Sequence, residues 1–278
     1  MADTAVVTSE IYSEKDYVCN LKKSDNKNVI AKFVFKYPLF DEDGDLIVQR
    51  SKESKVSEQF IEIEHSSISS LKLVGLQVWR GALLLSDYLL HLGPEKLKNS
   101  TILELGSGVG LTSIVASKYA KNVICTDVDL GNILKLISSN FLRNKHHVKS
   151  KYSILGLDFY ANEFSDELKE HLPNVSLVLA ADVIYDNDIT DAFVKTIERL
   201  LIEPPSKDIY IALEKRYVFT VSDLDSVAPC YEHFLLRLSE MMAKNKSKNW
   251  SAIQLDLDFP QYFRYDRVKQ FVLWKISS

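Results

Sequence analysis

The stretch Ile102-Leu103-Glu104-Leu105-Gly106-Ser107-Gly108-Val109-Gly110 decides the fold of this chain. It reads as a short apolar strand that enters a glycine turn, and a helix is predicted to follow over residues 111–120. Such a turn brings bare backbone and a helix N-terminus up to a ligand, because glycine has no side chain and tolerates left-handed backbone. The stretch therefore predicts a site for a nucleotide-like ligand.

The spacing of the glycines narrows the class of ligand. A dinucleotide-binding turn has the pattern G-x-G-x-x-G, which would place its third glycine at Leu111. This chain has E-x-G-x-G-x-G instead, and Glu104 would be a poor neighbour for a pyrophosphate. The glutamate suits a cationic ligand that carries an aminoacyl group, such as S-adenosyl-L-methionine.

Strand-like and helix-like segments alternate from residue 71 to residue 278. Helices are predicted at 78–91 (ended by Gly93-Pro94), 111–120, 130–143, 188–201 and 231–244, and strands at 101–105, 122–126, 151–157, 175–181, 208–213, 251–257 and 268–276. This alternation predicts an α/β fold, a Rossmann-like seven-stranded sheet with helices on both faces. No helix separates the last two strands, so we expect them to pair antiparallel at one edge, with the last strand antiparallel to the sheet.

Residues 1–70 do not show this alternation of strands and helices. We expect them to form a flexible tail and a β-rich N-terminal extension to the domain of residues 71–278. Strands are predicted at 31–35, 46–49 and 60–64, the last because apolar and acidic residues alternate there. The acidic segment 41–45 contains Asp-Gly and is typical of a solvated loop.

The bulk properties exclude several classes of protein. The formal net charge is −4, so there is no overall basic field of the kind that drives direct nucleic-acid binding. The three cysteines show no C-x-x-C pairing, and the six histidines show no metal-ligand spacing, so no metal site is predicted. Residues 1–12 resemble no signal or transit peptide, and no apolar run approaches the roughly 18 residues of a membrane span. We expect a soluble monomer of the nucleus or cytoplasm.

Ligands of parallel sheets bind at the carboxyl ends of the strands, near the point where the strand order reverses. At the end of the second strand, Asp127 is predicted to accept hydrogen bonds from ribose hydroxyls, although it could instead cap a helix. At the end of the third strand, Asp158 could accept from an exocyclic amine. Beside it, Phe159 could stack on a purine or belong to the core.

The fourth strand ends in Asp182-Val183-Ile184-Tyr185, which places a carboxylate and a phenol at the mouth of the expected site. Methyl transfer to an amine needs a neutral nitrogen lone pair aimed at the methyl carbon, and such groups can orient the amine and stabilise the charge that appears on it. The sequence Asn-Pro-Pro-Tyr, which would indicate amide or base nitrogens, is absent. The acidic residue favours a cationic amine such as lysine.

An ordered set of motifs resembles the seven-β-strand protein lysine methyltransferases known as methyltransferase family 16. The set consists of Val78-Trp79, ELGSGVG at 104–110, Thr126-Asp127, Leu157-Asp158-Phe159 and the D-x-x-Y of 182–185. The resemblance implies S-adenosylmethionine contacts at Trp79, Glu104, Gly106, Gly108, Asp127, Phe159 and Ala181, to which we add Ser107 and Asp158, and a role for Asp182 and Tyr185 around the target lysine. Many members have Trp in place of Phe159.

A closer match within that family, at 212–216, 259–261 and 273–276, implies a protein substrate of a nuclear, nucleic-acid-associated kind. Two alternatives stay open: a methyltransferase for RNA or a small molecule, and a binding subunit without catalysis. The basic run 143–151 is typical of a solvated helix end, although it could touch nucleic acid. Residues 214–216 either line the substrate side of the site or form a surface turn.

Overall fold

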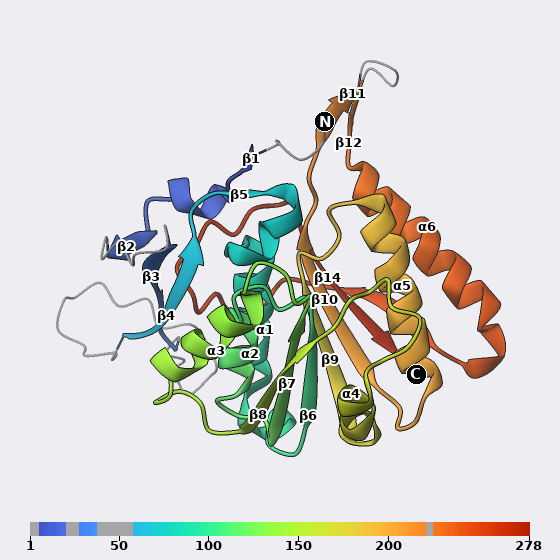
Figure 1. The fold of residues 1–278 in the computed structure, drawn as a ribbon. Coiled ribbons are helices and arrows are strands. Elements are labelled where there is room, and N and C mark those ends of the chain that lie inside the picture. Colours follow the sequence, from blue (N-terminus) through green and yellow to red (C-terminus); the bar gives the residue numbers. More distant parts are fainter. Residues whose placement is uncertain (1–5, 21–27, 38–57, 221–224) are drawn as a thin grey trace, which may run out of the picture.

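A mixed sheet of seven strands forms the centre of the computed structural model, which describes residues 6–20, 28–37, 58–220 and 225–278 (Figure 1). In spatial order the strands are β13 (Ser251–Leu255), β14 (Phe271–Ser277), β10 (Asp208–Glu214), β9 (Val175–Ala181), β6 (Thr101–Leu105), β7 (Asn122–Asp127) and β8 (Lys151–Gly156). Strands β6 to β10 are parallel, and β14 is antiparallel to both β10 and β13. The predicted sheet and its antiparallel closing pair are confirmed.

Helices cover both faces of this sheet. Two neighbouring residues of β6 show the division, because Ile102 belongs to one apolar cluster and Leu103 to the other, as the alternation of side chains along a strand requires. The first cluster includes residues of α1 (Arg80–Leu97), α2 (Leu111–Ala116) and α3 (Ile133–Arg143). The second includes residues of α4 (Asp166–His171), α5 (Asn187–Ile202) and α6 (Pro229–Lys244) (Figure 1).

The strand order reverses beside β6. From β6 the chain moves outward through β7 to the edge strand β8, and it then returns to β9 on the other side of β6. The crevice at such a reversal, at the carboxyl ends of the strands, is where ligands of open α/β sheets bind. The glycine turn after β6 lies at this point.

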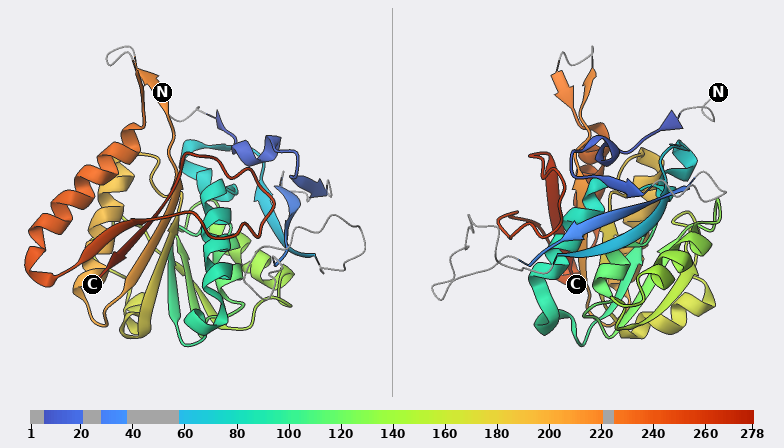
Figure 2. Two further views of the ribbon diagram at one scale, coloured as in Figure 1. Left: turned by 180° about the vertical axis from the view of Figure 1, so that it is seen from behind. Right: turned by 90° about the vertical axis from the view of Figure 1, so that its left-hand side faces the viewer.

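The N-terminal region forms a smaller three-stranded sheet of β2 (Val18–Asn20), β3 (Asn28–Phe35) and β4 (Gln59–Ser66), whose blue strands run across the front of the molecule in the right-hand view of Figure 2. It confirms the strands predicted at 31–35 and 60–64. The predicted strand at 46–49 and loop at 41–45 lie outside the described residues. A second, two-stranded pairing joins β1 (Val6–Val7) to β5 (Ser69–Ser70).

Asn140 of α3 and Asn144, the C-cap residue of the same helix, fasten this small sheet to the larger domain. The Asn140 amide accepts from the Glu64 backbone nitrogen at 2.8 Å and donates to the Glu64 carbonyl at 2.9 Å. Asn144, one helical turn later, makes the same pair of bonds with Glu62, at 2.9 and 2.7 Å. The two amides therefore satisfy the free edge of β4 as a neighbouring strand would.

Several element boundaries differ from the prediction. Helix α1 starts at Arg80, two residues later than predicted. Gly93, with φ 65° and ψ −176°, interrupts it where the sequence predicted its end, and a further helical turn runs from Pro94 to Leu97. Helix α2 ends at Ala116 because tighter turns follow, such as the bond from the Lys118 nitrogen to the Val115 carbonyl. Several short elements were not predicted from the sequence: β1, β2, the 3-10 turn η2 (Glu10–Ser13), α4, and the hairpin of β11 (Val218–Thr220) and β12 (Asp225–Val227). None of the described helices has the length and apolar character of a membrane span.

Candidate active site

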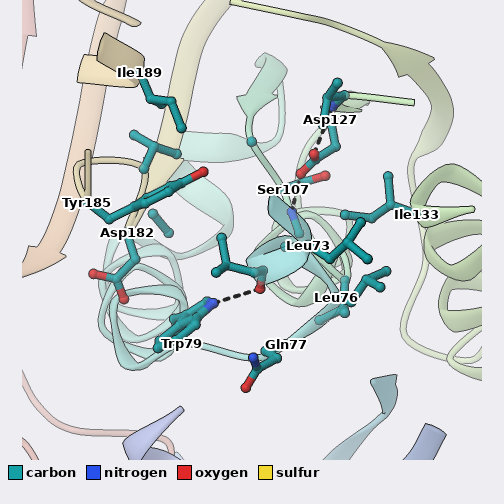
Figure 3. Close-up of a pocket in the computed structure, with 18 of the residues that line it drawn as sticks. Leu73, Leu76, Gln77, Trp79, Ser107, Asp127, Ile133, Asp182, Tyr185 and Ile189 are labelled. Atoms are coloured by element: carbon teal, nitrogen blue, oxygen red, sulfur yellow. Dashed lines mark hydrogen bonds between the residues drawn. The ribbon is translucent and has the colours of Figure 1, made fainter. Parts of the chain in front are cut away.

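A cavity of about 540 Å³ opens at the carboxyl ends of β6, β7, β8 and β9 (Figure 3). Its volume lies in the usual range for a small-molecule site. All the residues predicted to bind cofactor or to act in catalysis line it: Trp79, Glu104, Gly106, Ser107, Gly108, Asp127, Asp158, Phe159, Ala181, Asp182 and Tyr185. The structure thus brings together side chains from four strand ends and from the start of α1.

The glycine turn has a backbone that only glycine adopts without strain. Gly106, Gly108 and Gly110 have φ of 64°, 55° and 85°. A side chain at Gly106 would also meet Val183, whose Cγ1 lies 2.8 Å from the position of an added Cβ. The turn therefore exposes bare backbone to the cavity, as the sequence predicted.

Asp127 holds this turn in place. Its Oδ2 accepts from the Gly108 nitrogen at 2.7 Å, and its Oδ1 accepts from the nitrogen of Val128 at 2.8 Å. The carboxylate does not cap α3, whose N-cap is Asn132. Each oxygen retains a lone pair for a ligand hydroxyl. Burial raises the pKa of Asp127 to about 7.

Glu104 lies beneath the turn and is almost fully buried, at 1% exposure. One of its oxygens accepts a hydrogen bond from the hydroxyl of Ser113. Burial raises the pKa of Glu104 to about 7, because desolvation favours the neutral acid. A cationic ligand group would favour the ionised form.

One wall of the cavity, which packs beside the glycine turn, was not predicted from the sequence. It is the 3-10 segment η3 (Leu71–Leu76), whose Leu73 and Leu76 point into the cavity together with Ile133 of α3 (Figure 3). Gly131 lets this wall approach, since an added Cβ there would lie 2.7 Å from Leu73. The signal in the sequence was the apolar run of residues 71–76, which lies just before α1 but does not continue into that helix.

Trp79 and Phe159 supply aromatic faces to the cavity. The indole N–H of Trp79 donates to the Val74 carbonyl at 2.9 Å, which ties the start of α1 to η3. Phe159 packs against Phe193 of α5, with ring centroids 5.5 Å apart. It lies next to Asp158, whose carboxylate accepts from the Tyr160 nitrogen at 2.9 Å.

Asp182 follows β9 with left-handed backbone, φ 52°. Its Oδ2 accepts from the Gly81 nitrogen at 2.6 Å and its Oδ1 from the Glu214 nitrogen at 3.0 Å. In Figure 3 its carboxylate turns toward the start of α1, whereas the ring of Tyr185 extends across the cavity. Burial raises the pKa of Asp182 from its ordinary value and that of Tyr185 to about 12, so the phenol stays protonated.

The residues present fit S-adenosylmethionine. The Ser107 hydroxyl is buried and has no hydrogen-bond partner among the described residues, so it is free to bond with a ligand. Two buried carboxylates face a cavity with an apolar wall and aromatic faces. In the described part of the chain, no three His, Cys, Asp or Glu residues are grouped as metal ligands would be.

Comparison with known proteins gives a family match. The family model described as lysine methyltransferase matches residues 55–228. Methyltransferase-like protein 22 of Homo sapiens is 33% identical over 265 residues, which are 87% of this chain and 65% of that protein. The Mus musculus protein of the same name is 34% identical over 255 residues, with coverages of 86% and 64%.

More distant matches include the protein-lysine N-methyltransferase EFM3 of Chaetomium thermophilum, 29% identical over 54% of this chain and 46% of that protein. Among solved structures, M. jannaschii TYW2 in complex with AdoMet aligns with a TM-score of 0.45 and 13% identity, over 86% of this chain and 92% of that one. The chain spans somewhat less than two thirds of the length of the methyltransferase-like protein 22 relatives.

Proposed function

The chain belongs to the lysine methyltransferase family, and from that premise we propose that it is an S-adenosylmethionine-dependent protein-lysine N-methyltransferase. The observation that carries the proposal is one cavity lined by the glycine turn, the two buried carboxylates Glu104 and Asp127, and the pair Asp182 and Tyr185. When bound, S-adenosylmethionine supplies an electrophilic methyl group on a sulfonium centre. The remaining chemistry falls to the side chains of the cavity.

The donor half of the site consists of the turn and the residues around it. The bare backbone of 106–108 and the Ser107 hydroxyl would bind the aminoacyl part, with Glu104 as the counter-charge for its ammonium group. Asp127 would accept from the ribose hydroxyls, and Phe159 and Asp158 would hold the base. Trp79 and Ala181 would close the cavity near the methyl group.

The acceptor half consists of Asp182 and Tyr185. Because Tyr185 stays protonated at neutral pH, it can donate a hydrogen bond or present its oxygen to the amine. Asp182 is fixed by two backbone donors, and its charge favours the cationic amine that forms on methylation. The target lysine has to arrive as the neutral amine, so turnover should rise with pH from 7 to 9.

A methyltransferase that acts on RNA or a small molecule would need the same donor half, and a binding subunit would keep the cavity without turnover. We therefore test the class of acceptor with methyl-tritiated S-adenosylmethionine and a cell extract. We expect label in protease-sensitive, nuclease-resistant material from the wild type and its loss with Tyr185→Phe, a variant that keeps the ring. Label in nuclease-sensitive material would contradict the proposal. A nuclear or cytoplasmic location, a nucleic-acid-associated acceptor and a monomeric state stay predictions from the sequence.

A further inference from the structure

An N-terminal segment, residues 6–14, lies against the wall of the cavity although it is far from that wall in the sequence. Beyond the β1–β5 pairing, the Ser9 nitrogen donates to Oε1 of Gln77 at 2.9 Å, and the Gln77 amide donates to the Val7 carbonyl at 2.9 Å. The Val78 nitrogen donates to the Tyr12 hydroxyl, also at 2.9 Å. The two residues that precede Trp79 are thus held by residues 7–12.

A chain of contacts leads from this segment to Trp79. Glu10 pairs with Arg216 at 2.8 Å, and the guanidinium carbon of Arg216 lies 4.7 Å from the centre of the Trp79 ring. Both partners of the ion pair are partly exposed, at 35% for Arg216 and 46% for Glu10. Their pairing therefore does not hold the core together, but it fixes where the guanidinium lies over the indole.

A second glutamate of the same segment, Glu14, contacts the first residue of α1. Glu14 pairs with Arg80, whose Nη1 also lies 3.3 Å from both carboxylate oxygens of Glu214. The Glu214 backbone nitrogen is one of the two donors to Asp182. The end of β10, two residues before Arg216, is thereby bonded to both Arg80 and Asp182.

Arg216 also acts on Asp182 by its charge. Burial raises the pKa of Asp182. Among the groups that lower this pKa, the positive charge of Arg216 has the largest effect, whereas the negative charge of Glu10 raises it. Two further charged groups lie near Asp182. Glu214 faces it from the end of β10, and Arg80 pairs with Glu214. Arg216 thus connects Trp79 with Asp182, both of which line the cavity.

We propose that Glu10 is a positioning residue of the end of the site where the donor and acceptor halves meet, and that it acts through Arg216 on Trp79 and Asp182. The inference rests on the proposed function and adds to it a residue outside the segment 55–228 that the family model matches. Residues 214–216 then belong to the substrate side of the site, the first of the two interpretations that the sequence left open.

The test compares wild type, Glu10→Gln, Arg216→Gln and the double variant, with Glu240→Gln as a control for an exposed glutamate paired with arginine, Arg237, elsewhere. The first measurement is the initial rate of labelling of extract protein with methyl-tritiated S-adenosylmethionine. We expect each single change to slow labelling by about twofold to fivefold, as the loss of one exposed ion pair or cation–π contact allows. The double variant should be no slower than Arg216→Gln, because Glu10 acts only through Arg216.

Affinity for S-adenosylhomocysteine should stay within about twofold and the unfolding temperature should not change, since neither residue lies in the cavity wall or the core. A Glu10→Gln protein that labels at the wild-type rate would overturn the proposal. The proposal would also be overturned if the rate losses of the two single variants multiplied in the double variant. A slower labelling rate that is fully explained by weaker cofactor binding or by unfolding would overturn it as well.

A second measurement does not depend on methyl transfer. Tryptophan emission should change in Glu10→Gln and in Arg216→Gln, and neither change should alter the emission of a Trp79→Phe protein. If the wild type labels no protein, the proposed function fails, and this comparison still decides whether Glu10 acts on Trp79. Emission that is unaffected by Glu10→Gln would refute the positioning role.

Discussion

The carboxylate of Asp182, just past the end of β9, lies 2.6 Å from the backbone nitrogen of Gly81 in the first turn of α1. The N-cap residue of that helix, Trp79, offers no side-chain acceptor, so Asp182 satisfies a free N–H group of the helix from another element. This bond joins the acceptor side of the site to the helix that begins at the cavity wall.

Replacing Gly81 by alanine should break this junction. An added Cβ would lie 2.6 Å from the Asp182 carboxyl carbon, so the carboxylate would have to leave its backbone donors. We expect a loss of about 1–3 kcal/mol in the free energy of unfolding and a drop in methyl transfer of at least tenfold. Thermal unfolding and extract labelling measure the two effects. Gly156→Ala is the control, because its Cβ would make only ordinary contacts, and equal behaviour of the two variants would contradict the account.

Gly106→Arg should abolish binding of S-adenosylhomocysteine. The position has left-handed backbone and no room for a side chain beside Val183, and an arginine would also enter the cavity. Titration calorimetry measures the affinity, with circular dichroism to show that the variant folds. Unchanged affinity in the folded variant would place the cofactor elsewhere.

Cofactor affinity should depend on pH near neutrality. The pKa values of Glu104 and Asp127 are both raised to about 7, so part of each carboxyl group is protonated at pH 6 to 7. A ligand with an ammonium group and hydroxyl donors binds the ionised forms, so affinity should rise between pH 6 and 8 and binding should release protons. Calorimetry in two buffers of different ionisation enthalpy detects that release. Glu104→Gln should weaken the pH dependence of cofactor affinity. A wild-type affinity that does not change between pH 6 and 8 would refute this prediction.

Asn140→Ala should loosen the small N-terminal sheet. The Asn140 amide bonds to both backbone groups of Glu64 and also donates to the Val109 carbonyl at 3.0 Å, so its loss leaves buried groups unpaired. We expect a destabilisation of about 2–3 kcal/mol in denaturant unfolding. Ser139→Ala, on the exposed side of the same helix, should change stability by less than about 0.5 kcal/mol. A similar small effect for both would mean that the asparagine bonds do not fasten the sheet.

The sequence predicted those parts of the molecule whose conformation is set locally. The strand of 101–105 was predictable because its run is apolar and its turn needs glycine at 106, 108 and 110. Neighbouring strand ends then brought Asp127 and Phe159 to the same cavity, because parallel strands end at the same edge of the sheet.

The rest depends on contacts between distant residues. The segment of residues 6–14 has no periodicity of its own and is held by partners such as Gln77, which lies 68 residues after Ser9. The bonds of Asp182 to Gly81 and Glu214 follow from how three elements meet, and no local pattern encodes that meeting. The wall at 71–76 was missed for the same reason, since it is a 3-10 segment defined by what it covers.

The most direct test of the central claim is the chemical identity of the methylated product. Extract protein is labelled with methyl-tritiated S-adenosylmethionine, hydrolysed completely in acid and separated by chromatography beside methylated amino-acid standards. We predict radioactivity in mono-, di- or trimethyllysine with the wild-type protein and none with Gly106→Arg. Label in methylarginine or in nucleotides, or unlabelled protein in the presence of a wild type that binds S-adenosylhomocysteine, would contradict the proposed function.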